Sequence, residues 1–200
     1  MKKMKKKLEI KFLFVNFLTF FRLISASIIA LFLYFFNKTN IFYLFYSSFA
    51  VFILASISDF FDGFLARKWK IVSEFGQIFD PITDKILTTT TFFFLAYLLL
   101  VPWFFVLIFI LRDIIVDGLR IFLAKKSVII AANFWGKLKT VLQIMAISII
   151  FLGYSISVQI YQSYYYLFNL GIIFSAFISL ISGLFYIRAI AKLVKGKISN

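Results

Sequence analysis

The chain has 200 residues, of which 63% are hydrophobic and only 15% are charged. Ordinary globular proteins carry roughly 25% charged residues, so this composition excludes a typical soluble domain and indicates an integral membrane protein. The chain contains no cysteine and no histidine, which excludes disulfides, thiolate metal sites and histidine acid–base chemistry. Any catalysis must therefore come from carboxylates, lysine, arginine, hydroxyl groups or a hard metal ion.

The net charge of +14 limits the kinds of partner that the protein is expected to bind. In a soluble protein such a charge would suggest nucleic-acid binding. Here the basic residues flank apolar segments, a pattern typical of membrane orientation and of contact with anionic lipid. We therefore expect membrane lipid, and no nucleic acid, among the partners.

The N-terminus is strongly basic, with lysines at positions 2, 3, 5, 6, 7 and 11. A basic stretch before an apolar one resembles a signal peptide, but no small-residue cleavage site follows it. Asn16, Thr19 and Arg22 also interrupt the apolar run early. The stretch is therefore predicted to be an uncleaved, amphipathic juxtamembrane segment.

Long apolar runs recur along the rest of the chain. A helix needs about 20 apolar residues to span a bilayer, and runs of this kind cover residues 17–36, 41–66, 76–100, 102–124, 134–153 and 163–190. No linker is long enough to separate a second domain. We therefore expect an all-α, integral membrane bundle of six transmembrane helices that forms a single domain over residues 1–200.

Basic residues mark alternate connections between these spans. Both termini and the second and fourth connections are rich in lysine and arginine, whereas the first, third and fifth are not. This asymmetry predicts a multi-pass protein of the plasma membrane with both termini in the cytoplasm. Tyr161 and the tyrosines at 164–166 are predicted to form an aromatic belt at the outer surface.

The acidic residues carry the functional signal. Of eight acidic residues, six lie in or beside apolar helices, where an ionisable group is costly and is a functional hypothesis by default. The alternative is that each pairs with lysine or arginine to hold helices together. Asp59 and Asp62 are three apart and Asp80 and Asp84 are four apart, so each pair shares a helix face.

The two pairs flank one short basic connection, which predicts an antiparallel helix hairpin with four carboxylates at one depth near the cytoplasmic surface. Such carboxylates cannot all stay ionised without a counter-charge. One or two divalent cations supply it, and all-oxygen ligands favour Mg²⁺, Mn²⁺ or Ca²⁺. Because Mg²⁺ is often bound through few carboxylates plus substrate phosphate oxygens, the sequence indicates a phosphorylated substrate.

The full pattern is Asp59-x2-Asp62-Gly63-x2-Ala66-Arg67-x8-Gly76-x3-Asp80-x3-Asp84. It resembles the signature of the CDP-alcohol phosphotransferase family at all eight positions. The resemblance covers most of the chain and implies six spanning helices and a homodimer. Three further stretches resemble members of this family that use glycerol 3-phosphate. They are Asn16-x2-Thr19-x2-Arg22, residues 79–85, and residues 112–120 with 135–140. Asp113, Asp117 and Ile121 depart from their usual pattern, which has Glu, Ser and an acidic residue there.

This resemblance implies a reaction between CDP-diacylglycerol as donor and glycerol 3-phosphate as acceptor. It implies two Mg²⁺ ions, with Mn²⁺ as the alternative, held by Asp59, Asp62, Asp80 and Asp84. Asp84 would also be the catalytic residue that takes the proton of the acceptor hydroxyl. The residues implied to bind CDP-diacylglycerol are Asn16, Thr19, Arg22, Gly63, Ala66, Arg67, Ser73 and Gly76. For the glycines and Ala66, close helix packing is the competing interpretation.

Glycerol 3-phosphate is a dianion, so its site needs additional positive charge. Arg112 lies about twelve residues from the cytoplasmic end of its span, roughly 18 Å at helical rise, which is a depth similar to that of Asp84. The predicted acceptor-phosphate ligands are Arg112, Arg120, Lys137 and Lys139. For the two lysines, ordinary positive-inside charge is an equally good interpretation.

Three alternatives stay open at this point. A sibling enzyme would use inositol phosphate, serine or phosphatidylglycerol instead of glycerol 3-phosphate. A cation channel or transporter would spread its carboxylates across the membrane depth, whereas here they gather at one side. Nucleic-acid binding has little support, because little chain is left to fold outside the membrane.

Overall fold

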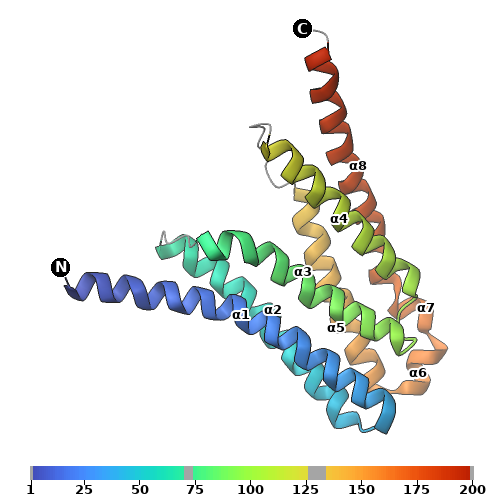
Figure 1. The fold of residues 1–200 in the computed structure, drawn as a ribbon. Coiled ribbons are helices and arrows are strands. Elements are labelled where there is room, and N and C mark those ends of the chain that lie inside the picture. Colours follow the sequence, from blue (N-terminus) through green and yellow to red (C-terminus); the bar gives the residue numbers. More distant parts are fainter. Residues whose placement is uncertain (1, 70–73, 126–133, 199–200) are drawn as a thin grey trace. The chain divides into compact units, whose positions relative to one another are not determined.

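The computed structural model describes the backbone of residues 2–69, 74–125 and 134–198 and the side chains of residues 20–58, 82–83, 85–123 and 134–188. Every described element is an α-helix, which confirms the predicted all-α class (Figure 1). The helices are α1 (Lys2–Thr39), α2 (Phe42–Trp69), α3 (Glu74–Tyr97), α4 (Trp103–Lys125), α5 (Phe134–Ile156), α6 (Val158–Ser163), α7 (Tyr165–Phe168) and α8 (Leu170–Ile198).

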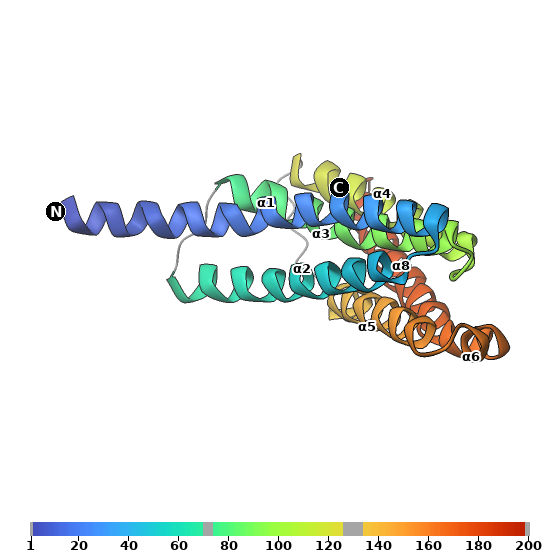
Figure 2. The same cartoon turned by 90° about the horizontal axis from the view of Figure 1, so that it is seen from below.

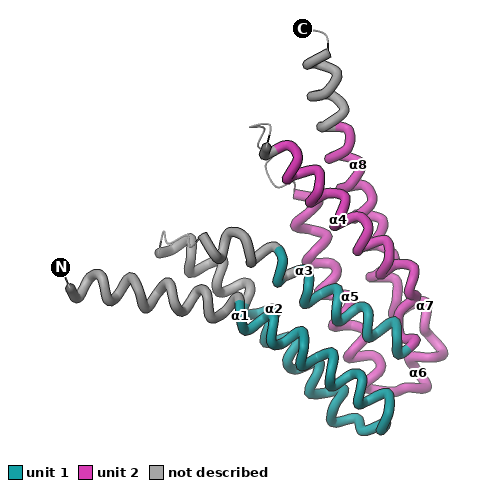
Figure 3. The backbone as a smooth tube through the Cα atoms, viewed as in Figure 1, with its two compact units in different colours: residues 1–98 teal, residues 99–200 magenta. Residues whose placement is uncertain are grey.

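The helices group into two compact units, residues 1–98 and residues 99–200 (Figure 3). The first unit contains α1, α2 and α3, and the second contains α4 to α8. Each unit has its own buried core and is described by itself.

In the first unit, α1 packs along both α2 and α3, and Figure 2 shows α1 and α2 side by side. The connection between α1 and α2 is tight because Asn40 has φ 55°, a left-handed conformation that asparagine tolerates. The Asn40 N–H donates to the Phe36 carbonyl at 2.8 Å. The core consists of large apolar side chains with no exposed surface, among them Ile29, Leu33, Phe45 and Phe52.

In the second unit, α8 packs against both α4 and α5. Polar side chains close one end of this unit around a single backbone carbonyl. Tyr161 Oη donates to the Leu100 carbonyl at 2.6 Å, and Asn169 Nδ2 donates to the same oxygen at 3.1 Å. Burial raises the pKa of Tyr161 above its ordinary value, so its hydroxyl stays protonated and keeps donating. These bonds join the start of α4 to the segment before α8.

Three described helices are long and apolar enough to cross a membrane: Phe20–Thr39, Phe134–Ile156 and Leu170–Arg188. A fourth apolar stretch, Phe42–Ser58, is shorter. Large apolar side chains such as Leu31, Phe93 and Ile114 stay more than half exposed, as expected for surfaces that contact lipid.

The helix boundaries differ from the prediction mainly before α8. A single span was expected over residues 163–190, but α8 begins at Leu170 and the short helices α6 and α7 precede it. Ser157 caps α6, because its Oγ accepts from the Ile160 N–H at 3.3 Å. The prediction that Tyr161 belongs to an exposed aromatic belt is wrong: Tyr161 is 1% exposed, whereas Tyr166 is 79% exposed.

Candidate active site

The four motif aspartates lie on two helices of the first unit. Asp59 and Asp62 fall in α2, and Asp80 and Asp84 fall in α3. The helical backbone confirms that each pair has the spacing of one helix face, and α2 contacts α3. The side chains of these four aspartates lie outside the described residues, so the metal site stays a prediction.

The same holds for most residues predicted to bind CDP-diacylglycerol. Ser73 lies outside the described residues altogether. The others are on helices, but their side chains are not described; they are Asn16 and Thr19 on α1, Gly63, Ala66 and Arg67 on α2, and Gly76 on α3. Within the described side chains, no group of three acidic residues gathers as a metal site would require.

Arg22 is the one predicted donor-site residue whose side chain is described. It comes from α1 and is 0% exposed. A guanidinium inside an apolar helix bundle is costly unless it meets partners. Its complete burial fits a residue that binds a ligand or joins a polar cluster better than a residue that sets membrane orientation, since orienting arginines stay near the surface.

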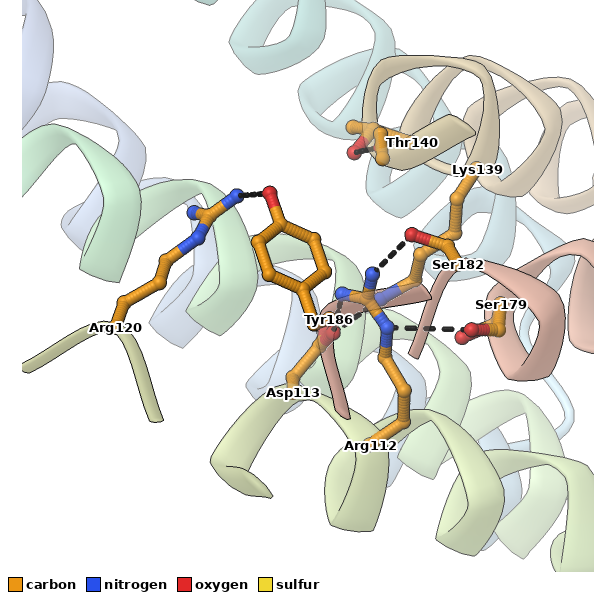
Figure 4. A network of polar contacts seen from close by, with 9 residues as sticks. Arg112, Asp113, Arg120, Lys139, Thr140, Ser179, Ser182 and Tyr186 are labelled. Carbon is orange, nitrogen blue, oxygen red and sulfur yellow. Dashed lines mark hydrogen bonds and ion pairs between the residues drawn. The ribbon is translucent and has the colours of Figure 1, made fainter. Parts of the chain in front are cut away.

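The second unit contains a described network of polar side chains centred on Arg112 (Figure 4). Arg112 comes from α4 and reaches α8, where its Nε donates to the Ser179 carbonyl at 3.3 Å and its Nη2 donates to Ser182 Oγ at 2.6 Å. Its Nη1 donates to Asp113 Oδ1 at 2.9 Å. The guanidinium is therefore held from two helices.

Lys139 joins this network from α5. Its Nζ lies 2.5 Å from Asp113 Oδ1, the same oxygen that accepts from Arg112. The side chains are little exposed, at 5% for Lys139, 11% for Arg112 and 15% for Asp113. Two helices, α4 and α5, thus bring two cations to one carboxylate oxygen. Two adjacent cationic donors of this kind match a phosphate dianion, which arginine binds in a planar, bidentate way.

Arg120 and Lys137 occupy different surroundings. Arg120 Nη2 donates to Tyr186 Oη at 2.5 Å, and its Cζ lies 4.9 Å from the centroid of the Tyr186 ring. Figure 4 shows this pair beside the Arg112 network. Lys137 is exposed. Of the four predicted acceptor-phosphate ligands, the structure therefore joins Arg112 and Lys139 in one network, pairs Arg120 with Tyr186, and leaves Lys137 at the surface.

The sequence prediction did not include the partners that α8 supplies. Ser179 and Ser182 are both 0% exposed, and Tyr186 is 3% exposed. A signal was present, because serines at 175, 179 and 182 recur at helical spacing and small polar residues in apolar helices mark contact faces. That signal locates a helix interface but does not identify Arg112 as its partner.

An apolar hollow in the second unit offers no polar side chains. It has a volume of about 630 Å³ and is lined by apolar residues of α4 and α8, including Phe105, Ile108, Phe174 and Phe177. A surface of this kind suits hydrocarbon chains. This hollow is therefore not a candidate for phosphate binding, unlike the cluster around Arg112.

Comparison with known proteins identifies the family of this chain. The family model described as CDP-alcohol phosphatidyltransferase matches residues 12–185. The chain belongs to this family. The match spans most of both compact units, so the aspartate helices and the helices of the Arg112 network belong to one family sequence.

Individual relatives carry the name of one specific activity within this family. A CDP-diacylglycerol–glycerol-3-phosphate 3-phosphatidyltransferase of Mycoplasma pneumoniae is 35% identical over 154 residues, which are 74% of this chain and 68% of that protein. The protein of the same name from Rickettsia typhi is 40% identical over 139 residues, 70% of this chain and 77% of that one. The one from Bacillus subtilis is 39% identical over 102 residues, 51% and 53% of the two chains.

Together, the family and the apolar helices identify a membrane-embedded transferase of glycerophospholipid synthesis. The family assignment confirms the resemblance seen in the aspartate motif. With this assignment, the buried charges can be explained without a channel or a nucleic-acid-binding function.

Proposed function

We propose that this chain transfers a phosphatidyl group from CDP-diacylglycerol to glycerol 3-phosphate, giving phosphatidylglycerophosphate and CMP. The names of the relatives support this substrate pair. Within the structure, the supporting observation is the buried pair of cations, Arg112 and Lys139, at one oxygen of Asp113. An acceptor that carries a phosphate needs such a pair, whereas an uncharged alcohol does not.

The chemistry of the motif residues fits a divalent cation. Asp59, Asp62, Asp80 and Asp84 offer only carboxylate oxygens, which are the donors that Mg²⁺ and Mn²⁺ prefer. We propose that these four residues hold two Mg²⁺ ions, with Mn²⁺ as the alternative. Bound there, the ions would neutralise the charge of the diphosphate and of its leaving group.

The proton transfer during the reaction uses a residue of the chain itself. The acceptor hydroxyl attacks the phosphorus on the lipid side of the diphosphate, a new P–O bond forms, and the bond to the CMP phosphate breaks. Asp84 accepts the hydroxyl proton, and CMP leaves with the electron pair of the broken bond. Phosphoryl transfer depends mainly on positioning and charge stabilisation, so a carboxylate is a sufficient base when the proton moves late.

The donor and acceptor groups would be bound by different sets of residues. The CDP-diacylglycerol set is Asn16, Thr19, Arg22, Gly63, Ala66, Arg67, Ser73 and Gly76. Arg112 and Lys139 would bind the acceptor phosphate directly. Arg120, already bonded to Tyr186, and the exposed Lys137 would contribute attraction from farther away.

The membrane arrangement is part of the proposal. Residues 1–200 would act as a single domain with six spans, an N-terminal amphipathic segment, and both termini and the active site on the cytoplasmic side of the plasma membrane. The alternation of basic connections supports this orientation. The enzyme would work as a homodimer, as the family resemblance implies.

A CMP-release assay with the purified full-length protein tests the proposal. CDP-diacylglycerol and Mg²⁺ are supplied with one alcohol at a time: glycerol 3-phosphate, glycerol, inositol phosphate, serine or phosphatidylglycerol. Rapid release with glycerol 3-phosphate and little with glycerol is expected, because only the former offers a phosphate to Arg112 and Lys139. Release with serine or inositol phosphate but not glycerol 3-phosphate would contradict the proposed acceptor and favour a sibling activity.

A further inference from the structure

The Arg112 side chain is held in place by groups that have no assigned part in the reaction. Ser182 Oγ accepts from Nη2 at 2.6 Å, the Ser179 carbonyl accepts from Nε at 3.3 Å, and Asp113 Oδ1 accepts from Nη1 at 2.9 Å. Figure 4 shows the guanidinium lying between these groups. Each of its three nitrogen atoms is therefore bonded, and the plane of the group is oriented.

This arrangement leaves N–H donors of Arg112 with fixed directions for a ligand. A guanidinium has five N–H groups, and three of them are used in these bonds. Two remain, one on each terminal nitrogen. Because the bonded N–H groups restrict rotation of the side chain, the two remaining donors have fixed directions before any ligand arrives.

Asp113 adds a second constraint, since its Oδ1 accepts from Arg112 and also contacts Lys139 Nζ at 2.5 Å. Two cations that share one oxygen are held close together despite their mutual repulsion. Without the carboxylate they would separate, because like charges in a poorly hydrated site repel strongly. The spacing of the two cations is therefore set by Asp113.

We propose that Ser182 and Asp113 are positioning residues for the acceptor phosphate: Ser182 sets the direction of the Arg112 guanidinium, and Asp113 sets the spacing between Arg112 and Lys139. This inference rests on the proposed function. Neither residue needs to touch the substrate. Their effect is to spare the rotamer entropy that two long, mobile side chains would otherwise lose when the acceptor binds.

Helix α8 provides matched controls for this proposal. Ser175, Ser179 and Ser182 are all 0% exposed. Only Ser182 gives its side-chain oxygen to Arg112; Ser179 gives its backbone carbonyl, and Ser175 Oγ donates to the Ile172 carbonyl within α8 at 3.0 Å. Each of the three serine-to-alanine changes removes one buried hydroxyl from α8, but only the change at Ser182 removes a bond to Arg112.

The experiment measures CMP release by Ser182→Ala, Ser179→Ala, Ser175→Ala and Ser182→Thr in the full-length enzyme. For Ser182→Ala, the KM for glycerol 3-phosphate is expected to rise about tenfold, the size of one lost hydrogen bond to a charged group. Its KM for CDP-diacylglycerol is expected to stay within about twofold of the wild type. The Ser179 and Ser175 variants should match the wild type, and Ser182→Thr, which keeps a hydroxyl, should restore most of the affinity.

Asp113 is tested by Asp113→Asn and Asp113→Glu. The asparagine keeps an oxygen but loses the charge, so kcat/KM for glycerol 3-phosphate is expected to fall about a hundredfold, whereas Asp113→Glu keeps the charge and should recover at least half of that loss on a logarithmic scale. If Asp113→Asn fails to fold, the serine series still decides the proposal. A second readout is the rise in Tm at a fixed concentration of glycerol 3-phosphate, which should become smaller as affinity falls.

The outcomes separate the two proposals. If Ser182→Ala behaves like Ser175→Ala in KM and in ligand-induced Tm shift, the positioning role is overturned while the wild-type reaction with glycerol 3-phosphate stands. If the wild type prefers another phosphorylated alcohol, the proposed acceptor fails, and the same KM series with that alcohol decides the positioning role. If the preferred acceptor carries no phosphate, both proposals are overturned.

Discussion

The two compact units display their charged residues in different ways. In the first unit, four aspartates stand in a short motif on α2 and α3, and Arg22 is completely buried. In the second unit, Arg112, Asp113 and Lys139 come from two helices that both pack on α8, and they bond to one another. The aspartates of the first unit thus come from neighbouring segments of the chain, whereas the bonded charges of the second unit come from distant segments.

This difference suggests a division of labour. Closely spaced carboxylates suit a metal ion, because a helical turn alone brings two of them to one face. A phosphate-binding cation pair needs opposing charge and rigid support, because long basic side chains repel one another and are mobile. The following predictions probe this division, from the largest expected effect to the smallest.

Removing divalent cations tests the acidic unit most severely. CMP release is expected to fall below detection after treatment with EDTA and to return when Mg²⁺ or Mn²⁺ is added, because four carboxylates without a cation would repel the diphosphate donor. Dialysis into metal-free buffer followed by titration of each ion measures this. Full activity in the presence of excess chelator would contradict the metal site and leave the aspartates without their proposed role.

Asp84→Asn should be the most damaging of the point substitutions. It removes both a metal ligand and the proposed base, and loss of general base catalysis alone costs about 10²–10⁴ in rate. We expect kcat to fall about a thousandfold or more at unchanged expression and helicity. Glu9→Gln, an acidic residue outside the motif, serves as the control and should retain activity. Normal CMP release by Asp84→Asn would rule out the proposed proton transfer.

Lys139 and Lys137 provide a paired test of the cationic unit. They lie two residues apart at the start of α5, but Lys139 is buried and bonded to Asp113, whereas Lys137 is exposed. Lys139→Met should lower kcat/KM for glycerol 3-phosphate about a hundredfold, near 2.7 kcal/mol, and Lys137→Met should change it by less than about threefold. Equal losses would favour general positive charge over a specific site.

Tyr186→Phe is expected to have a smaller effect than Lys139→Met. It removes the hydroxyl that accepts from Arg120 but keeps the ring that lies 4.9 Å from the guanidinium carbon. The remaining cation–π contact should hold Arg120 near its place, so the KM for glycerol 3-phosphate should rise by no more than about fivefold. Tyr186→Leu, which removes the ring as well, should exceed that effect; an identical result for both variants would show that the ring contributes nothing.

Much of the fold was predictable because apolar runs of spanning length need only local information. The helices over residues 41–66, 102–124 and 134–153 were expected, and α2, α4 and α5 lie there. The segment before α8 was not predicted, since its end is set by bonds from Tyr161 and Asn169 to the carbonyl of Leu100. Those partners are more than 60 residues away along the chain.

The candidate site divides in the same manner. The aspartate motif, its helical spacing and the family it indicates follow from residues within a span of 26 positions, from Asp59 to Asp84. The basic residues of the second unit were recognised as candidates, but charge patterning treated Lys137 and Lys139 alike. Only burial and the bond to Asp113 separate them.

The sequence by itself determined that this protein is a helical membrane transferase with four aspartates at helical spacing, because hydropathy and helical spacing act over neighbouring residues. Only the tertiary structure decided which cations work together and what holds them. Arg112, Lys139 and Ser182 come from α4, α5 and α8, and no local pattern encodes a contact between side chains 70 residues apart, as Arg112 and Ser182 are. Long-range packing brings them together.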